Sequence, residues 1–233
     1  MQIEIWSDIA CPWCYVGKRR FERALDRFAH KDDVEVLWRS FELDPSAPAT
    51  REESQTELLA SKYGVPVAQA EAMNARMTDA AKGEGLDFHF DRVKLGNTFD
   101  AHRLVHLAHE SGKQDAMKER LMRAYFTEGE AIGTRPVLER LAAEVGLDAD
   151  RVQETLAGDA YTGDVRADEM RARKLGITGV PFFVLDGRYG VSGAQSPELL
   201  LEALQQAYAE TKPRVTVLAG DRGARCDDDG CAL

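Results

Sequence analysis

The sequence lacks a long apolar segment, an excess of basic residues, an internal repeat and any low-complexity tract. No apolar run approaches the ~20 residues that a helix needs to cross a membrane, which argues against a membrane-embedded protein. Forty acidic residues outweigh thirty basic ones and give a net charge of −10. A general nucleic-acid binder needs a basic surface to neutralise phosphates. We therefore expect partners that are neither membranes nor nucleic acids.

Cysteine is scarce, and the N-terminus carries no visible secretory signal. No basic segment opens the chain, and Glu4 and Asp8 interrupt its short apolar run. A chain of 233 residues, 44% of them hydrophobic, can bury a core without disulfide bonds. Without such a signal, we expect a cytoplasmic protein. Because a reducing cytoplasm does not maintain structural disulfides, we expect the four cysteines, which fall in two pairs, to be redox-active or to bind a metal.

The two ends of the chain carry strand patterns, whereas the middle is helical. Near the N-terminus a strand, a helix and a second strand follow one another, an order that favours parallel strands with a right-handed crossover. Near the other end, the turn Asp186-Gly187 predicts a hairpin between two helices. The expected elements are strands at 3–6, 34–38, 182–185 and 188–191, and helices at 12–28, 161–175 and 196–210.

The sequence thus predicts an α/β fold in which one small sheet domain is interrupted by helices. Residues 1–44 and 161–212 form the sheet domain. Residues 45–160, where glycine and proline separate successive helical patterns, form a large all-helical insertion. Beyond Lys212 the chain becomes polar and rich in Gly and Asp, so we expect 213–233 to be a flexible tail.

Cys11-Pro12-Trp13-Cys14 lies where the first strand meets the first helix. At the N-cap, the free N–H groups and the positive end of the helix dipole favour a thiolate on Cys11. Cys14, one turn on, can close a disulfide with Cys11 or displace a thiol bound to it. Pro12 suits the first helical position, and Trp13 offers an apolar contact beside the sulfur. This placement favours redox chemistry over a metal site or two inert thiols.

Val180-Pro181 precedes the apolar strand of the hairpin. Proline cannot donate a hydrogen bond within a sheet, so it belongs at a strand's first residue or in a tight turn. A cis bond before Pro181 would leave the Val180 backbone free to pair with an extended substrate. An ordinary proline at a strand entry is the alternative, but the presence of Cys11 and Cys14 favours the cis interpretation.

These motifs resemble the DsbA family of thioredoxin-fold oxidoreductases, and most closely its FrnE-like branch. The resemblance covers about 1–212 and implies a thioredoxin fold beneath a helical lid. It implies that Cys11 is the nucleophile, Cys14 the resolving thiol and Pro181 the cis-proline facing them. The Pro12-Trp13 pair differs from the Pro-His pair of strongly oxidising members, so strong oxidising power is not expected. The segments that carry the resemblance are 6–8, 11–18, 97–103 and 179–183.

The same superfamily contains 2-hydroxychromene-2-carboxylate isomerases and kappa-class glutathione transferases. They resemble this chain in 97–103 but have a serine at the position of Cys11, so the cysteine favours redox chemistry. Glutathione remains a possible co-substrate, and no other cofactor is expected. The resemblance also gives His102 a role in the substrate pocket.

The second pair, Cys226 and Cys231, encloses four residues near the C-terminus. One interpretation is an accessory redox pair that exchanges electrons with Cys11 and Cys14. The other is a local disulfide. A further alternative is a zinc site made by all four cysteines, which would make the protein a non-catalytic binding protein.

Three histidines and a charged run in the insertion have simpler interpretations. His102, His106 and His109 fall near one helix face, but no acidic partner is evident, so we expect solvated or core histidines and no metal. The charges at 118–120 are typical of a solvated helix face.

The leading hypothesis is an enzyme, a cytosolic thiol–disulfide oxidoreductase that oxidises, reduces or isomerises protein or small-molecule disulfides. The first alternative is a glutathione-dependent transferase or isomerase of kappa-class type, and the second is the zinc-binding protein. We expect a monomer or a homodimer.

Overall fold

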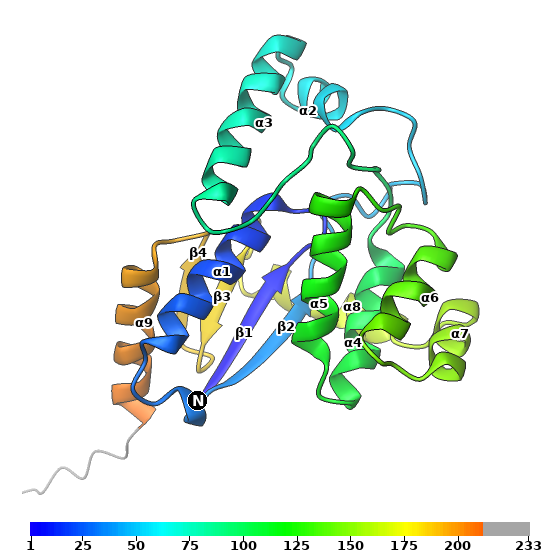
Figure 1. Cartoon of the computed structure of the whole chain (residues 1–233). Coiled ribbons are helices and arrows are strands. Elements are labelled where there is room, and N and C mark those ends of the chain that lie inside the picture. The colour runs from blue at the N-terminus through cyan, green and yellow to red at the C-terminus, as the bar shows by residue number, and fades with distance from the viewer. Residues whose placement is uncertain (212–233) are drawn as a thin grey trace, which may run out of the picture.

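The computed structural model describes residues 1–211, and its centre is a four-stranded sheet with strand order β2-β1-β3-β4 (Figure 1). β1 (Gln2–Ser7) lies parallel to β2 (Glu35–Ser40) and antiparallel to β3 (Phe182–Leu185). β4 (Tyr189–Ser192) pairs antiparallel with β3. The two ends of the described chain therefore share one sheet, and helices occupy the segment between β2 and β3. The predicted α/β fold, thioredoxin-like with a helical insertion, is confirmed.

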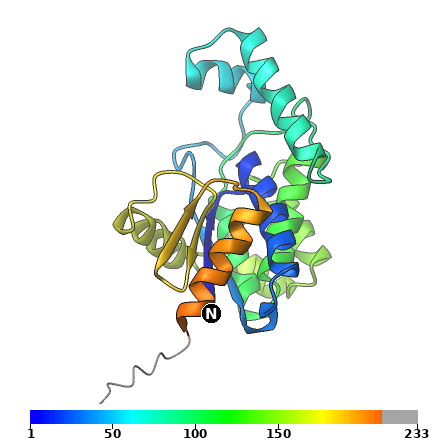
Figure 2. The same cartoon turned by 90° about the vertical axis from the view of Figure 1, so that its left-hand side faces the viewer.

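Helices cover both faces of the sheet. α1 (Pro12–Asp26) and α9 (Pro197–Thr211) pack together on one face, and α8 (Thr162–Lys174) covers the other (Figure 2). The remaining helices lie in the insertion, and two short helical turns are also present among the described residues. They are α2 (Gln55–Tyr63), α3 (Val67–Lys82), α4 (Phe99–Glu110), α5 (Gln114–Arg123), α6 (Arg135–Glu144) and α7 (Ala149–Ala157), with a 3₁₀ turn at Lys31–Asp33 and a π-helical turn at Ala124–Glu128.

The central strand β1 is buried on both faces, and its side chains alternate between two packing layers. Ile3 and Ile5 join the main core beneath α1, together with Phe21. Trp6 points to the opposite face, where it packs against α8 and its indole N–H donates a hydrogen bond to the Asp168 carbonyl at 3.0 Å. This alternation follows from the two-residue period of a strand.

The insertion is fixed to the edge of the sheet by α5. The side-chain amide of Gln114 accepts a hydrogen bond from the Trp38 N–H at 2.9 Å and donates one to the Trp38 carbonyl at 3.0 Å. The Trp38 indole N–H also donates to Asp115 at 3.0 Å. These bonds satisfy backbone groups of β2 that an exposed edge would leave open to another chain.

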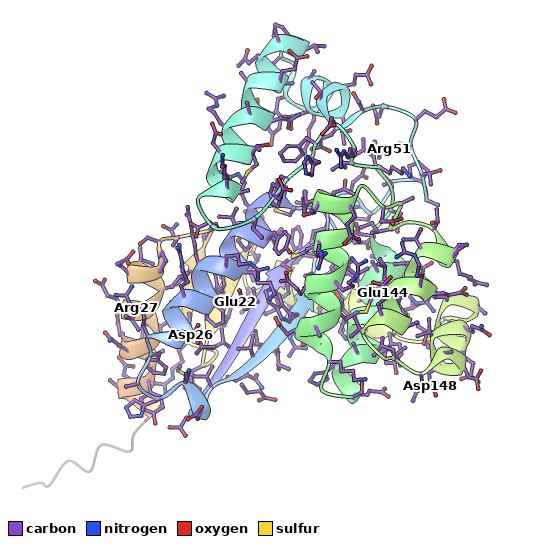
Figure 3. All side chains as sticks on the ribbon, in the orientation of Figure 1. Glu22, Asp26, Arg27, Arg51, Glu144 and Asp148 are labelled. Atoms are coloured by element: carbon purple, nitrogen blue, oxygen red, sulfur yellow. The ribbon has the colours of Figure 1, made fainter. Side chains whose placement is uncertain are left out.

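α2 and α3 form an arm that stands above the carboxyl end of β1 (Figures 1 and 2). A capping box of Ser54 and Glu57 begins α2, and Gly64 ends it in the left-handed region, with φ of 63°. Arg51 lies in the loop before α2 (Figure 3). Its side chain pairs with Asp44, and its backbone N–H donates to the Leu95 carbonyl at 2.9 Å. The arm is thus held over the region where α1 begins.

Candidate active site

Cys11 is the N-cap of α1, as predicted. Its φ and ψ of −93° and 111° are extended, Pro12 occupies the first turn, and that turn holds no acidic residue. The Cys11 thiol donates to the Val180 carbonyl, with Sγ and O 3.6 Å apart. Cys11 thus lies at the positive end of the α1 dipole, with no carboxylate in the first turn of the helix to oppose it.

The peptide bond between Val180 and Pro181 is cis, which confirms the predicted geometry. Within residues 1–211 the Val180 N–H donates no hydrogen bond, while the Pro181 carbonyl accepts one from the Gly193 N–H at 2.8 Å. Gly17 on α1 lets the helix approach this loop, because a Cβ there would lie 2.9 Å from the Pro181 Cγ. The loop thus presents an open backbone donor beside Cys11.

Cys14 lies behind Cys11, with only 1% of its surface exposed. Its backbone N–H donates to the Cys11 carbonyl at 3.0 Å, and both cysteines are free thiols in this structure. Burial raises the pKa of Cys14 well above the ordinary thiol value, and the hydrogen bond with Cys11 and the charge of Cys11 raise it further. Both sulfurs are thus buried, but Cys11, at 4% exposed, lines the cavity described below, whereas Cys14 does not and its thiol is held protonated.

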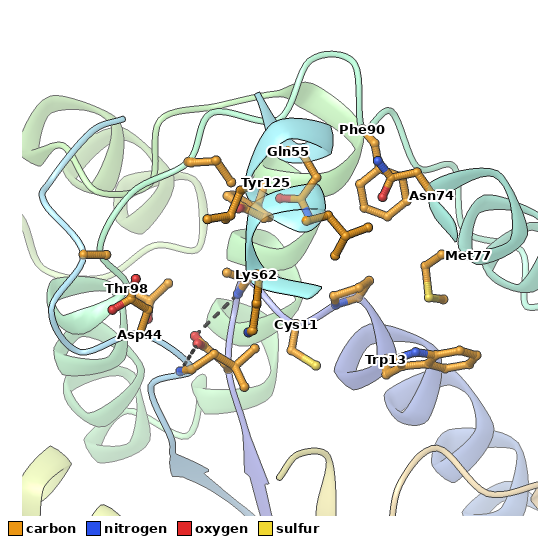
Figure 4. Close-up of a pocket in the computed structure, with 18 of the residues that line it drawn as sticks. Cys11, Trp13, Asp44, Gln55, Lys62, Asn74, Met77, Phe90, Thr98 and Tyr125 are labelled. Atoms are coloured by element: carbon orange, nitrogen blue, oxygen red, sulfur yellow. Dashed lines mark hydrogen bonds between the residues drawn. The ribbon is translucent and has the colours of Figure 1, made fainter. Parts of the chain in front are cut away.

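A cavity of about 620 Å³ opens between the α2–α3 arm and the sheet domain, and Cys11, Trp13 and Val180 are among the residues that line it. Figure 4 shows Cys11 and Trp13 on its floor. Figure 4 shows Asn74, Met77 and Phe90 on the wall opposite Cys11 and Trp13. The volume falls in the range typical of small-ligand sites. Most of the wall is apolar, and its polar groups are Asp8, Asp44, Arg51, Gln55, Ser61, Lys62, Tyr63, Asn74, Thr98 and Tyr125.

The predicted site residues separate into two groups. Trp13, which is 46% exposed, lines the cavity together with Cys11 and Val180. His102 does not line it; the ring is fully buried on α4, and its Nε2 lies 3.3 Å from Asp8 Oδ1. His102 therefore contacts a residue that lines the cavity, Asp8, without lining it itself. Cys226 and Cys231 lie outside the described residues, and the zinc site that would use them does too.

Asp8 is a functional candidate that the sequence did not single out. Burial alone would raise its pKa, but the hydrogen bond and charge of His102 and the Leu43 N–H, at 2.7 Å from Oδ2, hold the pKa below the usual value. Burial lowers the pKa of His102, and the bond to Asp8 opposes this. A carboxylate therefore faces the cavity beside the cysteines.

Lys118 contradicts the prediction of a solvated helix face at 118–120. Its side chain is completely buried, its Nζ donates to the Ser7 carbonyl at 3.1 Å, and it lies 5.8 Å from the centre of the Trp38 ring. Burial lowers its pKa to about 8, and the acidic groups Cys14 and Asp8 oppose this shift. One signal was present in the sequence, since Leu121 and Met122 share its helix face at spacings of three and four.

His102 is a core histidine, one of the two expected kinds, but the structure gives two of the three histidines acidic partners that were not evident in the sequence. His102 contacts Asp8, and the Nε2 of His106 lies 3.1 Å from both Ser40 Oγ and Asp168 Oδ2. Residues 1–211 hold no group of three or more His, Cys, Asp or Glu side chains placed to bind a metal ion. Across the same residues, no helix combines the length and apolar character needed to cross a membrane.

Comparison with known proteins agrees with this geometry. Residues 2–205 match the family described as the DSBA-like thioredoxin domain. The chain is 46% identical to a probable DsbA oxidoreductase of Streptomyces coelicolor, whose crystal structure it resembles with a TM-score of 0.87 over 100% of this chain and 99% of that one. It is 31% identical over 207 residues to the uncharacterized protein YwbO of Bacillus subtilis (strain 168), covering 88% of this chain and 96% of that protein.

A more distant structure shares the fold. The cytosolic disulfide reductase DsbM of Pseudomonas aeruginosa is 20% identical, with a TM-score of 0.64 over 90% of this chain and 100% of that one. A thioredoxin-like sheet, a CxxC pair at a helix N-terminus and a helical insertion define a protein of the DsbA type. The chain belongs to the DSBA-like thioredoxin domain family, whose chemistry is thiol–disulfide exchange.

Proposed function

We propose that the protein is a thiol–disulfide oxidoreductase in which Cys11 attacks substrate disulfides and Cys14 resolves the product. The Cys11 thiolate forms a bond to one sulfur of the substrate, and the other sulfur leaves as a thiolate. Cys14 then attacks Cys11, the Cys11–Cys14 bond forms, and the second substrate thiolate leaves; the substrate gains two electrons and the cysteine pair loses them. The observation that carries the proposal is the placement of Cys11 on the cavity floor, at the N-cap of α1, with Cys14 buried behind it.

The cavity supports substrates that enter between the arm and the sheet domain. An extended protein segment can donate to and accept from the backbone at Val180, and a small disulfide such as oxidised glutathione fits the available volume. Glutathione is thus a candidate co-substrate. We further propose that the protein belongs to the FrnE-like branch of the family, acts in the cytoplasm, and is a monomer or a homodimer.

The proposal includes Cys226 and Cys231 as an accessory redox pair that exchanges electrons with Cys11 and Cys14. Removal of residues 214–233 should slow turnover with any reductant that depends on the second pair, and unchanged turnover with every reductant would end this idea.

Redox titration tests the main proposal. After equilibration in a series of glutathione redox buffers, alkylation and mass spectrometry count the free thiols at Cys11 and Cys14. We expect reversible loss of both thiols together, and the midpoint gives the direction of electron flow in a glutathione-poised cytoplasm. A pair that never forms this bond would contradict the proposal. Stoichiometric zinc in the purified protein would favour the metal alternative.

The apolar cavity wall also supports a second candidate, a glutathione-dependent transferase or isomerase acting on an aromatic substrate. This reaction needs a sulfur nucleophile but no resolving thiol. A Cys14→Ser variant should therefore lose disulfide turnover under the main proposal and retain transferase or isomerase activity under the second.

A further inference from the structure

Tyr125 is a buried tyrosine whose hydroxyl has no hydrogen-bond partner within residues 1–211. Of the other five tyrosines, Tyr63 is exposed to solvent. The remaining four donate their hydroxyls to carboxylates, Tyr15 to Glu119, Tyr161 to Glu110, Tyr189 to Glu210 and Tyr208 to Asp33. Tyr125 is only 2% exposed, and a buried tyrosine hydroxyl usually finds a partner. This exception points to a partner that the described chain does not supply.

The Tyr125 hydroxyl can be reached from the cavity that also holds Cys11. Tyr125 is one of the residues that line this cavity (Figure 4). Thr98, buried at the start of α4, is a second lining residue whose hydroxyl makes no hydrogen bond in the described chain. The described polar atoms that are both unpartnered and fully enclosed include neither hydroxyl. In ligand cavities a few placed polar groups fix the orientation of the bound molecule, and these two hydroxyls are placed to do so.

Tyr125 belongs to a firmly held segment, the π-helical turn Ala124–Glu128 that follows α5. The ring of Phe126 packs edge-on against the Tyr125 ring, with ring centres 4.9 Å apart, and stacks on Phe88 at 4.6 Å. The Phe126 carbonyl accepts a hydrogen bond from the His89 N–H at 2.8 Å. π-helical turns are rare and frequently lie at functional sites. These contacts hold the Tyr125 ring at the cavity wall.

The surroundings of Tyr125 favour a neutral hydrogen-bond acceptor. The charged groups that act on its hydroxyl are Asp8 and Arg51. Arg51 already pairs with Asp44 and with Glu53, the latter at 3.0 Å, whereas Asp8 is a buried carboxylate that repels an anion. Burial raises the pKa of Tyr125, and the charge of Asp8 raises it further, so the hydroxyl stays protonated and donates. An amide carbonyl is the neutral acceptor that every peptide unit offers.

We infer that the Tyr125 hydroxyl donates a hydrogen bond to an amide carbonyl beside the disulfide of the substrate, an inference that deepens the proposed function and rests on it. The bond holds the body of the substrate against the cavity wall while one substrate sulfur lies at Cys11. Tyr125 keeps its proton and takes part in no covalent step. Protein segments and glutathione both carry such a carbonyl, so the experiment includes both.

Single-turnover oxidation of the full-length reduced protein by three disulfides tests this role. They are the disulfide of a short cysteine peptide with blocked termini, oxidised glutathione, and bis(2-hydroxyethyl) disulfide, which contains no amide. Acid quenching and mass spectrometry follow the Cys11–Cys14 bond and give a half-saturating concentration and a limiting rate. We expect Tyr125→Phe to raise the half-saturating concentration of the amide-containing substrate about 3- to 10-fold, the effect of one neutral hydrogen bond, and to leave the limiting rate unchanged.

The three substrates give distinct outcomes. A rise for the peptide disulfide alone supports the inference with protein segments as the source of the carbonyl, and a rise for oxidised glutathione alone supports it with glutathione as the source. A rise for both supports a carbonyl that the two share. No rise for either, or an equal rise for bis(2-hydroxyethyl) disulfide, would overturn the inference.

Tyr15→Phe is the matched control, because Tyr15 is equally buried, does not line the cavity and donates to Glu119 at 2.6 Å. It should lower the free energy of unfolding and leave all three half-saturating concentrations unchanged. Tyr125→Phe breaks no hydrogen bond within the described chain, so its stability should equal or exceed that of the unmodified protein. A loss of stability as large as that of Tyr15→Phe would reveal an internal partner for the Tyr125 hydroxyl and overturn the inference.

The same measurements separate failure of the inference from failure of the proposed function. If none of the three disulfides oxidises Cys11 and Cys14 in the unmodified protein, the proposed function itself fails. If all three react and Tyr125→Phe has the same constants as the unmodified protein, only the role of Tyr125 is contradicted.

Discussion

Gly17 and Pro181 lie against each other across the interface between α1 and the loop before β3. The space between them is too small for a side chain, since a Cβ added to Gly17 would lie 2.9 Å from the Pro181 Cγ. Alanine normally stabilises a helix interior relative to glycine. Here the added methyl meets the closed proline ring, which cannot rotate away. Close packing at this position therefore links the helix that carries Cys11 to the loop that carries Val180.

We predict that Gly17→Ala destabilises the protein by about 1–3 kcal/mol, the usual cost of overpacking. It should also slow the reaction of Cys11 with disulfides, because the loop beside the sulfur must move. Urea unfolding measures the change in stability, and the rate at which Cys11 reacts with the aryl disulfide dithiobis(nitrobenzoate) measures the change in reactivity. Gly163→Ala in α8 is the control, since a Cβ there meets nothing within 4 Å. Equal effects of both substitutions would contradict this account.

A second prediction concerns the bonds between Gln114 and Trp38. In the Gln114→Leu variant, the new side chain has a volume similar to that of Gln but cannot form hydrogen bonds. The buried N–H and carbonyl of Trp38 then lose these partners. We expect a loss of about 1–3 kcal/mol in the free energy of unfolding, the cost of leaving a buried polar group unsatisfied. Gln153→Leu, on the exposed face of α7, should change it by less than about 0.5 kcal/mol. A loss no larger than that of the control would show that α5 is held by packing alone.

The Asp8–His102 pair should make stability depend on pH. The folded-state pKa of His102 lies below its ordinary value of 6.5, so the unfolded chain binds a proton more readily as the pH falls below 6.5. The free energy of unfolding should therefore fall in that range. His102→Gln removes the titration, and its stability should fall less steeply over the same interval. Identical slopes in chemical denaturation series would contradict the prediction.

The cavity should contribute to substrate choice through Trp13. This side chain lines the cavity beside Cys11 and is 46% exposed, so Trp13→Ala should change stability by no more than about 0.5 kcal/mol. We expect KM to rise for disulfides with aromatic or apolar bodies and to change little for small ones. Met170→Ala, which is similarly exposed on α8 and does not line the cavity, is the control. An equal change for all substrates would argue against a selective wall.

Local features could be predicted from the sequence because each depends on neighbouring residues. Cys11 and Pro12 define a helix start, and Asp186 and Gly187 form the predicted turn with positive φ values of 51° and 66°. The return strand begins at Tyr189, one residue later than expected. The fold class followed from the order of such elements.

The groups beneath the cysteines could not be predicted, because the insertion brings them together. Asp8 and His102 are 94 residues apart in the chain, and Lys118 is 111 residues from Ser7. A lysine within a charged run is typical of a surface, and only tertiary packing places this one inside. The acidic partners of the histidines were missed for the same reason.

Trapping of the mixed disulfide tests the division of roles between the two cysteines most directly. In a Cys14→Ser variant treated with oxidised glutathione, mass spectrometry of the peptides from residues 1–211 should find one glutathione, attached to Cys11. Cys11→Ser should form no such adduct in residues 1–211. An adduct on Cys14 in the Cys11→Ser variant at the same rate, or none on Cys11, would contradict the account.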